Sequence, residues 1–416
     1  MKMFFRKIKI NKNLVFCAVL LFFAGLAAGE FNPYKRYFEI EVNVGDDTGI
    51  SNNWFSLNDF TQETLVVDFN EMSRSLKNGL TMNLTGNTGF DMKMKFTDDF
   101  KMRIFANADI MAQANISREI IDFLANGNSK ENMSVNGAFE TDGSAFISAG
   151  TDMTMFFNKL GVTLRGELFI PAFYIPRNST AVSVSAKDNG EINCDFSADI
   201  PVYSPFLVAA GKGISAGDLI KNGGIDFGVG LEYRFLENLE AGITLYNIPI
   251  KAAAVYNYTN VSLDGNYSID SILNVISGNS KINQEFKFNE LEYVTTGTPR
   301  LVYRPVDLGL DVLYKPFDEL LYLRGGMNFV FYDPFIFNFD LGVDLNLFKI
   351  GKMGSHILTL SYETGYVSRN WIQRGILNLD FRVLNLRFAA TSKSPSFAGS
   401  FTGKGIALGL GIAIGY

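Results

Sequence analysis

The sequence predicts an all-β fold, a transmembrane antiparallel β-barrel of about 14 strands, with 16 strands as the alternative. Many long segments alternate between apolar and polar residues, and their apolar side carries almost no charge. Beyond residue 29 the chain has no run of about 18 uncharged apolar residues, so no helix is expected to span a bilayer. Strands therefore have to do so.

The alternation is most regular in four segments of the chain. Residues 337–347 place Phe, Leu or Val at every odd position and Asn, Asp or Gly at every even one. Residues 225–235 repeat this pattern, and residues 90–96 alternate Phe and Met with Asp and Lys. Residues 405–416 alternate large apolar residues with Gly and Ala. Since side chains of a strand point to opposite faces in turn, each segment has one apolar face.

A soluble β-protein would also alternate, so strand length and charge have to decide. The alternating segments often run for ten residues or more, whereas strands of soluble proteins average about 5–6 residues. A tilted membrane strand needs about 9–11 residues. A charge at the bilayer midplane costs about 2–4 kcal/mol, which explains an apolar face without charge. Both features favour the membrane barrel.

Short turns alternate with long connections along the chain, and this alternation predicts fourteen strands. In bacterial barrels the short turns are periplasmic and the long loops extracellular. Two strand-like stretches, 181–200 and 256–302, are interpreted as extensions of long outer loops, and would raise the count to 16 or 18 if they crossed the membrane. The predicted strands are 37–45, 79–96, 100–110, 143–157, 160–170, 225–235, 238–247, 306–315, 319–331, 335–348, 355–366, 371–383, 385–391 and 402–416.

The N-terminus has the pattern of a secretion signal. A basic segment precedes an apolar run over residues 14–26, and the small residues 27–29 favour cleavage before Glu30. We therefore expect residues 1–29 to be a signal peptide and residues 30–416 to form a single barrel in the outer membrane. Cleavage would remove Cys17 and leave Cys194 alone, so no disulfide within the mature chain is expected.

Four short amphipathic helices are predicted between the strands, over residues 68–78, 117–126, 215–222 and 268–277. Leu-Lys-Asn-Gly at 76–79 resembles Ile-Lys-Asn-Gly at 220–223, and Gly-Asn-Ser-Lys recurs at 127–130 and 278–281. This predicts an internal duplication of residues 65–175 and 212–332. The helices could pack a long loop, gate the lumen or dock on the lipid surface.

One hairpin pattern is similar to a known family. Gly230, Tyr233 and Arg234 precede a short turn and then Leu239 and Gly242, with Tyr-Asn-Ile-Pro following at 246–249. Residues 310–325 repeat this arrangement loosely. The pattern resembles an uncharacterised family of spirochaete and Bacteroidetes outer-membrane proteins, which is similar in turn to the 14-stranded long-chain fatty acid transporter superfamily. The resemblance implies a 14-stranded barrel and transport of a hydrophobic solute.

The sequence offers little for catalysis. His356 is the only histidine, and metal sites normally use clusters of His or Cys. We expect no enzyme activity, no cofactor and no metal. The net charge of −6 gives no basic face for nucleic acid, so the expected partners are outer-membrane lipid and the barrel-insertion machinery. The terminal aromatic residue Tyr416 resembles the insertion signal that such machinery recognises.

The polar faces of the strands predict a lumen lined by both charge signs. Interspersed charges favour a salt-bridge lattice that stiffens the wall, whereas one clustered sign would favour a selectivity ring. The leading hypothesis is a passive channel or transporter for small or hydrophobic solutes, and the alternative is an adhesin or secretion scaffold acting through its outer loops. The predicted lumen-facing residues are Lys93, Lys95, Arg103, Arg165, Glu167, Asp226, Glu232, Arg234, Asp307, Asp311, Arg324, Asp340, Asp344, Asp380 and Arg382.

Overall fold

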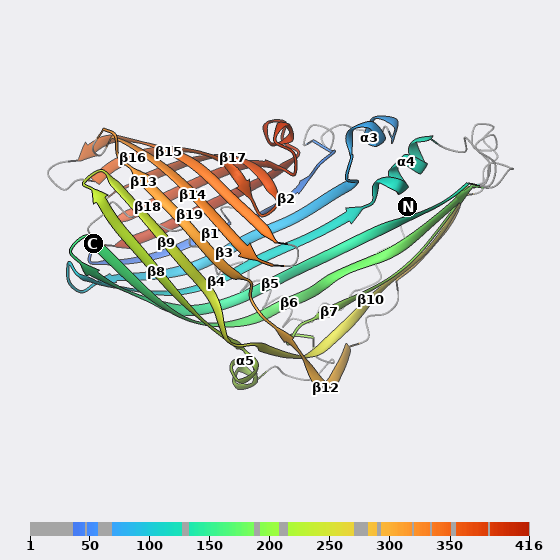
Figure 1. Cartoon of the computed structure of the whole chain (residues 1–416), viewed down its shortest axis with the longest axis horizontal. Coiled ribbons are helices and arrows are strands. Elements are labelled where there is room, and N and C mark those ends of the chain that lie inside the picture. Colours follow the sequence, from blue (N-terminus) through green and yellow to red (C-terminus); the bar gives the residue numbers. More distant parts are fainter. Residues whose placement is uncertain are drawn as a thin grey trace.

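Fourteen antiparallel strands close into a barrel in the computed structural model (Figure 1). Closure is made by β1 and β19, where Glu39 pairs with Gly415 and Val44 with Leu410. This confirms the predicted fold class and strand count. The structure describes residues 36–45, 48–56, 69–126, 133–186, 192–207, 215–269, 282–288, 293–317, 320–332, 335–350, 355–381 and 383–415.

Around the barrel, each strand pairs with the next one in the ring, and only β2, β7, β10, β11 and β12 lie outside this order. Short turns join the strands at the end where both termini of the described chain lie. The long connections all lie at the opposite, outer end, where only β14–β15 and β16–β17 of the ring are joined by short turns. The strands of the ring are β1 (Phe38–Val44), β3 (Leu80–Lys95), β4 (Phe100–Ile116), β5 (Met133–Phe157), β6 (Leu160–Ala186), β8 (Gly224–Leu236), β9 (Leu239–Lys251), β13 (Val306–Tyr314), β14 (Leu321–Phe331), β15 (Ile336–Ile350), β16 (Ser355–Val367), β17 (Asn370–Asp380), β18 (Leu384–Ser394) and β19 (Gly405–Gly415).

The outward face of the ring is apolar, and the inward face is mostly polar or small. Along β19, Leu408 and Ile414 are 64 % and 57 % exposed, whereas the residues directly before them, Ala407 and Ala413, are nearly inaccessible. An exposed apolar surface of this extent is unfavourable in water, and it is the surface that a membrane barrel presents to lipid. Aromatic side chains contact one another near the outer end and form an aromatic belt. Its members are Phe329, Phe331, Phe335, Phe337, Phe339, Trp371, Phe397 and Phe401.

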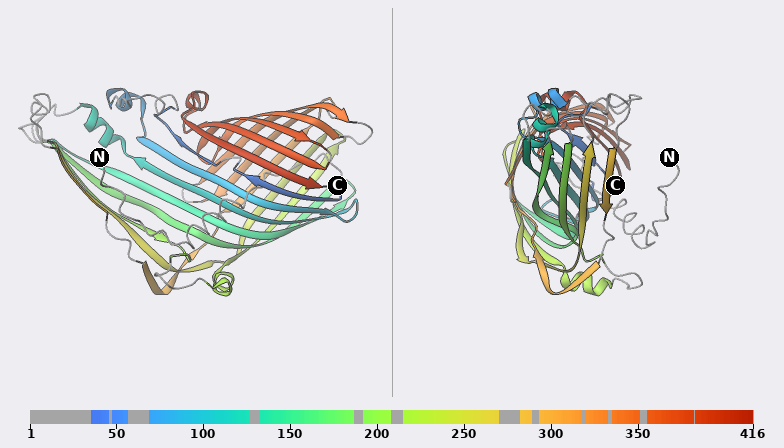
Figure 2. Two further views of the ribbon diagram at one scale, coloured as in Figure 1. Left: turned by 180° about the vertical axis from the view of Figure 1, so that it is seen from behind. Right: turned by 90° about the vertical axis from the view of Figure 1, so that its right-hand side faces the viewer.

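β5 and β6 are far longer than the strands predicted for them, because they continue past the outer end of the barrel (Figure 2). There they form a sheet, named here the outer sheet, with β7 (Ile192–Tyr203), β10 (Ala253–Ile269), β11 (Ile282–Phe288) and β12 (Tyr293–Val302). The interpretation of 181–200 and 256–302 as loop extensions is therefore confirmed for their described residues. These strands pair with one another and do not enter the ring.

Three of the predicted helices are present at the outer end: α3 (Phe69–Ser75), α4 (Arg118–Asn126) and α5 (Ala216–Asn222). α3 and the residue that follows it, Leu76, pack against α4 through Met72, Leu76 and Ile121. The predicted fourth helix lies outside the described residues except for 268–269, which end β10. Among the residues that the structure describes, none of the helices has the length and hydropathy of a membrane span.

Both halves of the predicted duplication place the matching Asn-Gly pair where a helix leads into a barrel strand: Asn78-Gly79 follows α3, and Asn222-Gly223 ends α5 and precedes β8. The duplication itself stays a prediction. The predicted signal peptide and Tyr416 lie outside the described residues. A short strand, β2 (Gly49–Asn52), and a 3-10 turn, η2 (Ala398–Phe401), complete the outer end of the ring beside β19.

Candidate functional site

The inner wall carries a ladder of ion pairs between neighbouring strands. Arg165 on β6 holds Asp152 on β5 through two nitrogens, at 2.7 and 2.8 Å. Arg324 on β14 holds Asp344 on β15 in the same way, at 2.8 and 2.9 Å, and reaches Glu363 on β16 at 2.8 Å. Two parallel hydrogen bonds fix both position and orientation of the guanidinium. These pairs link neighbouring strands of the wall, which is the arrangement that the salt-bridge interpretation predicts.

Arg165 also stacks on aromatic rings of the inner wall. Its guanidinium carbon lies 4.8 Å from the ring centre of Phe105 and 3.8 Å from that of Tyr246. Phe105 also contacts Arg103, whose guanidinium carbon lies 5.0 Å from the ring centre. Arg103 Nε in turn pairs with Asp91 Oδ1 at 2.5 Å. Aromatic faces attract cations, so these rings help to hold the ladder where water is scarce.

A second group of ion pairs lies at the end with the short turns. Lys93 on β3 pairs with Glu41 at 2.8 Å and with Glu39 at 3.5 Å. Arg36, which precedes β1, reaches Glu39 at 2.6 Å and Asp380 on β17 at 3.0 Å. Because Arg36 joins β1 to β17, this contact bridges strands that are not neighbours and fixes the start of the barrel.

At the outer end, polar contacts cross the barrel instead of following the wall. Arg369, in the turn between β16 and β17, reaches Gln113 on β4 and Asp142 on β5, the latter at 3.2 Å. Around the ring, five strands separate β17 from β5 on the side of β19, namely β18, β19, β1, β3 and β4, so the contact between Arg369 and Asp142 joins distant parts of the wall. Asn370 likewise accepts hydrogen bonds from Ser51 at 2.5 Å and from Asn83 at 3.2 Å.

These contacts form what we name the outer seal: Arg369, Asn370, Gln113, Asp142, Ser51 and Asn83. Lys393 on β18 extends it by donating to Thr85 on β3 at 2.7 Å. Asn370, Ser51 and Lys393 are almost completely buried. Since buried polar groups are costly unless paired, the seal is a packed part of the interior rather than a water-filled opening.

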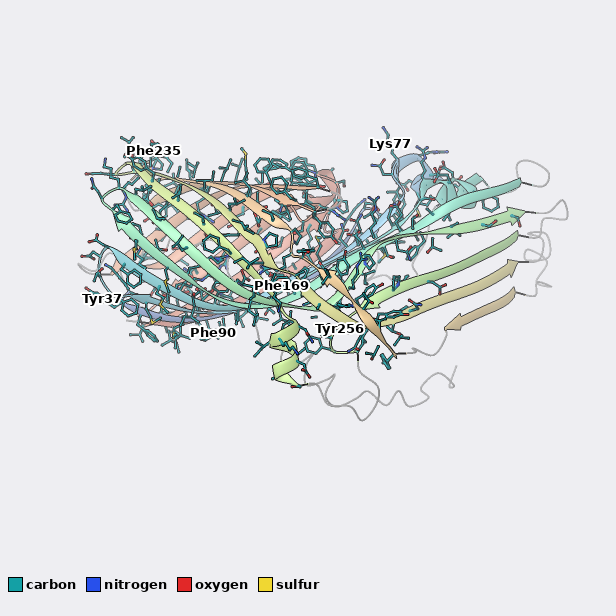
Figure 3. The ribbon with its side chains drawn as sticks, turned by 60° about the horizontal axis from the view of Figure 1, so that its bottom comes forward. Tyr37, Lys77, Phe90, Phe169, Phe235 and Tyr256 are labelled. Carbon is teal, nitrogen blue, oxygen red and sulfur yellow. The ribbon has the colours of Figure 1, made fainter. Side chains whose placement is uncertain are left out.

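On the other side of the mouth an apolar cluster lines the interior. Phe146 on β5 and Phe169 on β6 meet edge to face, with ring centres 5.8 Å apart. The base of the β10–β12 hairpin covers them with Ala253, Val255 and Val302, and we name these five residues the mouth cluster. Phe169 lies where the barrel passes into the outer sheet (Figure 3).

Arg304 enters the barrel beside the mouth cluster. It follows β12 and precedes β13, and its guanidinium carbon lies 5.7 Å from the ring centre of Phe169. Its Nη1 is 2.5 Å from Glu167 Oε1 and 3.7 Å from Asp226 Oδ2. A residue from an outer loop therefore supplies the counter-charge for two acids of the barrel wall.

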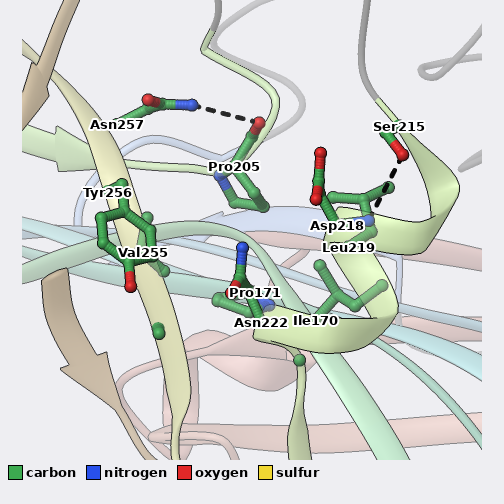
Figure 4. A pocket seen from close by; sticks show the side chains of 12 residues that line it. Ile170, Pro171, Pro205, Ser215, Asp218, Leu219, Asn222, Val255, Tyr256 and Asn257 are labelled. Atoms are coloured by element: carbon green, nitrogen blue, oxygen red, sulfur yellow. Dashed lines mark hydrogen bonds between the residues drawn. The ribbon is translucent and has the colours of Figure 1, made fainter.

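A pocket opens on the other side of Val255, outside the ring (Figure 4). It lies between α5 and the start of β10. Lys251 Nζ donates to Lys221 O at 2.6 Å and ties α5 to the end of β9. The pocket adjoins the mouth cluster through Val255, and its lining includes Ile170, Pro171, Leu219 and Tyr256.

Comparison with known proteins gives only distant structural likenesses. No family model matches the sequence, and neither does any curated protein. A crystal structure of the Pseudomonas putida toluene transporter TodX aligns at a TM-score of 0.42 and 10 % identity, covering 94 % of this chain and 95 % of that one. The Ralstonia pickettii toluene transporter TbuX aligns at a TM-score of 0.32 and 9 % identity, covering 92 % of this chain and 90 % of that one. Pseudomonas aeruginosa OccK8 aligns at a TM-score of 0.26 and 8 % identity, covering 92 % of this chain and 98 % of that one.

Similarity at these values carries no argument about the activity of this chain, which has to come from its own residues. Most of the predicted lumen residues take part in the contacts described above. Lys95 pairs with Asp98, and Arg234 with Glu240 at 3.1 Å, both near the short turns. Arg382 lies outside the described residues. Within the described chain, no cation lies at ion-pair distance from four of the predicted acids, Glu232, Asp307, Asp311 and Asp340.

Sequence reasoning missed several residues of the site. Glu39 and Glu41 alternate with Phe38, Ile40 and Val42, so their inward position on β1 could have been predicted from that pattern. Arg304 and Arg369 lie in a loop and a turn, where no periodicity indicates direction. Within the described part of the chain, no group of three His, Cys, Asp or Glu side chains is arranged to hold a metal ion.

Proposed function

We propose that this chain is an outer-membrane channel or transporter that passes small or hydrophobic solutes passively through the barrel. The observation that carries the proposal is the charged inner wall. Ionisable residues inside a membrane protein are costly and normally mark a solute or ion pathway. Asp311 points inward on β13 and is nevertheless exposed, so solvent has access to part of the interior. A barrel that served only as an anchor would not need this.

The apolar features of the mouth support a hydrophobic solute. The pocket between α5 and β10 lies outside the ring, and the mouth cluster lies inside it, with Val255 shared by both. We expect an apolar solute to leave water in the pocket and then to pack against the aromatic rings of the mouth cluster. Each Å² of apolar surface removed from water lowers its free energy by about 25 cal/mol. The outer seal accounts for a closed resting state.

The proposal is tested with the purified, folded barrel in planar bilayers and in liposomes. We expect discrete conductance steps, or uptake of an apolar solute such as toluene faster than in protein-free vesicles. A folded barrel, verified by its heat-dependent mobility in gels, that gives neither conductance nor uptake would rule the proposal out.

A second function, as an adhesin or secretion scaffold, is favoured by the outer sheet. β5, β6, β7 and β10 extend well past the ring and present a large surface outside the membrane region (Figure 1). Stable binding of a protein by the full chain, lost when residues 258–296 are replaced by a short linker, would favour this function. A channel without such a partner would keep its conductance after the same replacement.

A further inference from the structure

Two carboxylates face each other directly on the inner wall, just inside the outer mouth. Glu167 on β6 and Asp226 on β8 are cross-strand partners, and they are 4 % and 1 % exposed. Like charges placed opposite each other destabilise a sheet, and a buried charge is costly unless it is paired. A barrel that keeps both acids at this position needs a cation between them.

Arg304 supplies that cation, but it satisfies the two acids poorly. Its Nη1 alone approaches both carboxylates, at 2.5 and 3.7 Å. Glu167 Oε2 and both carboxylate oxygens of Asp226 accept no hydrogen bond from the described part of the chain, and Nη1 itself makes none. Arg165 and Arg324, in contrast, each hold one carboxylate through two nitrogens. Arg304 is thus a weaker partner than the arginines of the wall.

The origin of Arg304 also differs from that of the wall arginines. Arg165 and Arg324 sit on barrel strands, whereas Arg304 arrives from the loop between β12 and β13. It can therefore leave without breaking the hydrogen bonds of the ring. Beside the two acids, the face of Phe169 offers a second attraction for a cation. The rest of the mouth cluster offers apolar surface.

We propose that Glu167, Asp226 and Phe169 form a binding site for hydrophobic cations, that is, an ammonium, guanidinium or amidinium group on an apolar body. Arg304 is the built-in occupant of this site, and an incoming cation displaces it. The two carboxylates share the single Nη1 of Arg304, and their free oxygens accept the N–H groups of the ligand. The apolar body packs against Phe146, Phe169 and Val255. This assignment rests on the proposed function, and names a class of solute for it.

Benzamidine is the probe, because its amidinium group donates to carboxylates and its ring is apolar; benzamide is its neutral isostere. Binding to the full folded chain in detergent micelles is measured by calorimetry. We expect saturable benzamidine binding to the natural chain and at least about tenfold weaker binding of benzamide, a factor that corresponds to about 1.4 kcal/mol. Equal binding of the two compounds, or no saturable binding of benzamidine, would overturn the assignment.

Two variants identify the site. Arg304→Gln removes the occupant, and we expect benzamidine to bind at least about tenfold more tightly. Arg300→Gln is the matched control, because Arg300 lies on neighbouring β12, is exposed and contacts Tyr203 instead of the acids. Unchanged affinity in a folded Arg304→Gln chain would contradict the proposal.

Asp226→Asn decides the matter if Arg304→Gln does not fold. It leaves a one-to-one pair of Arg304 and Glu167, and we expect benzamidine binding to weaken at least about tenfold. Unchanged affinity would overturn the proposal. Binding in micelles needs no transport, so a chain that conducts ions but fails these tests would contradict the cation site and leave the channel standing. A chain that binds benzamidine but shows no conductance would contradict the channel and leave the binding site standing.

Discussion

Arg369 and Asp142 form an ion pair across the barrel, with Nη1 3.2 Å from Oδ2. Arg369 reaches this position from a two-residue turn in which it and Ser368 have positive φ angles of 65° and 49°. Such turns favour Gly and Asn, because other side chains adopt positive φ at a cost. The turn is held by Asn338 and Asn370, which bond the backbone of Ser368 at 2.9 Å.

Replacing Arg369 by Gln should loosen the outer seal. Asp142 then loses its charged partner, and we expect a several-fold higher single-channel conductance together with a loss of about 1–3 kcal/mol in the free energy of unfolding. Exchanging the pair, Arg369→Asp with Asp142→Arg, should restore the low conductance. Arg177→Gln is the control, because its contact with Glu140 is exposed and 3.8 Å long. Equal conductance in all four proteins would show that the seal does not limit passage.

Replacing Arg324 by Met should destabilise the barrel wall. Among the described residues, the change leaves Asp344 without a cation at ion-pair distance and Glu363 with Arg374 as its remaining partner, at 2.9 Å. Removing one partner of a buried ion pair costs about 3–5 kcal/mol; because the Arg324 side chain is 30 % exposed, we expect a loss of about 2–3 kcal/mol in urea unfolding in micelles. Arg234→Met removes a more exposed pair and should change stability by less than about 1 kcal/mol. Similar losses for both variants would refute a stiffening role of the ladder.

Gly224 should not tolerate a side chain. A Cβ there would lie 2.1 Å from Cζ of Phe169, so the ring would have to leave the mouth cluster. We expect Gly224→Ala to cost about 1–3 kcal/mol of unfolding free energy, as overpacking does. Gly375→Ala is the matched control, since a Cβ on that strand residue meets no atom within 4 Å. A neutral Gly224→Ala would mean that Phe169 is not held in this cluster.

Most of the ring could be predicted from sequence, because lipid imposes a period of two on every membrane strand. Residues 337–347 of β15 show why: apolar side chains at odd positions have to face outward, so Asp340 and Asp344 face inward. The count of fourteen followed from the turns between such segments. The same rule identifies Glu39 and Glu41 on β1, although its short length hides the pattern.

The outer seal and the position of Arg304 could not be predicted in this way. Arg369 and Asp142 are far apart in sequence, and their contact depends on how the ring curves. Beyond the ring, where the lipid constraint does not apply, β6 continues through its pairing with β7 and β5 through its pairing with β6. Periodicity fixes which face a residue occupies, but contacts between distant strands need the closed structure.

The central claim, that lipid covers one face of the strands and water reaches the other, is tested at two adjacent residues. Leu310 and Asp311 are both exposed on β13 but point to opposite faces. Trp is introduced as Leu310→Trp or Asp311→Trp in a chain carrying Trp54→Phe and Trp371→Phe, and quenching is measured in bilayers with brominated acyl chains. Strong quenching at position 310 and little at 311 is the predicted result. Equal quenching at both positions, or none at either, would contradict a membrane-spanning barrel.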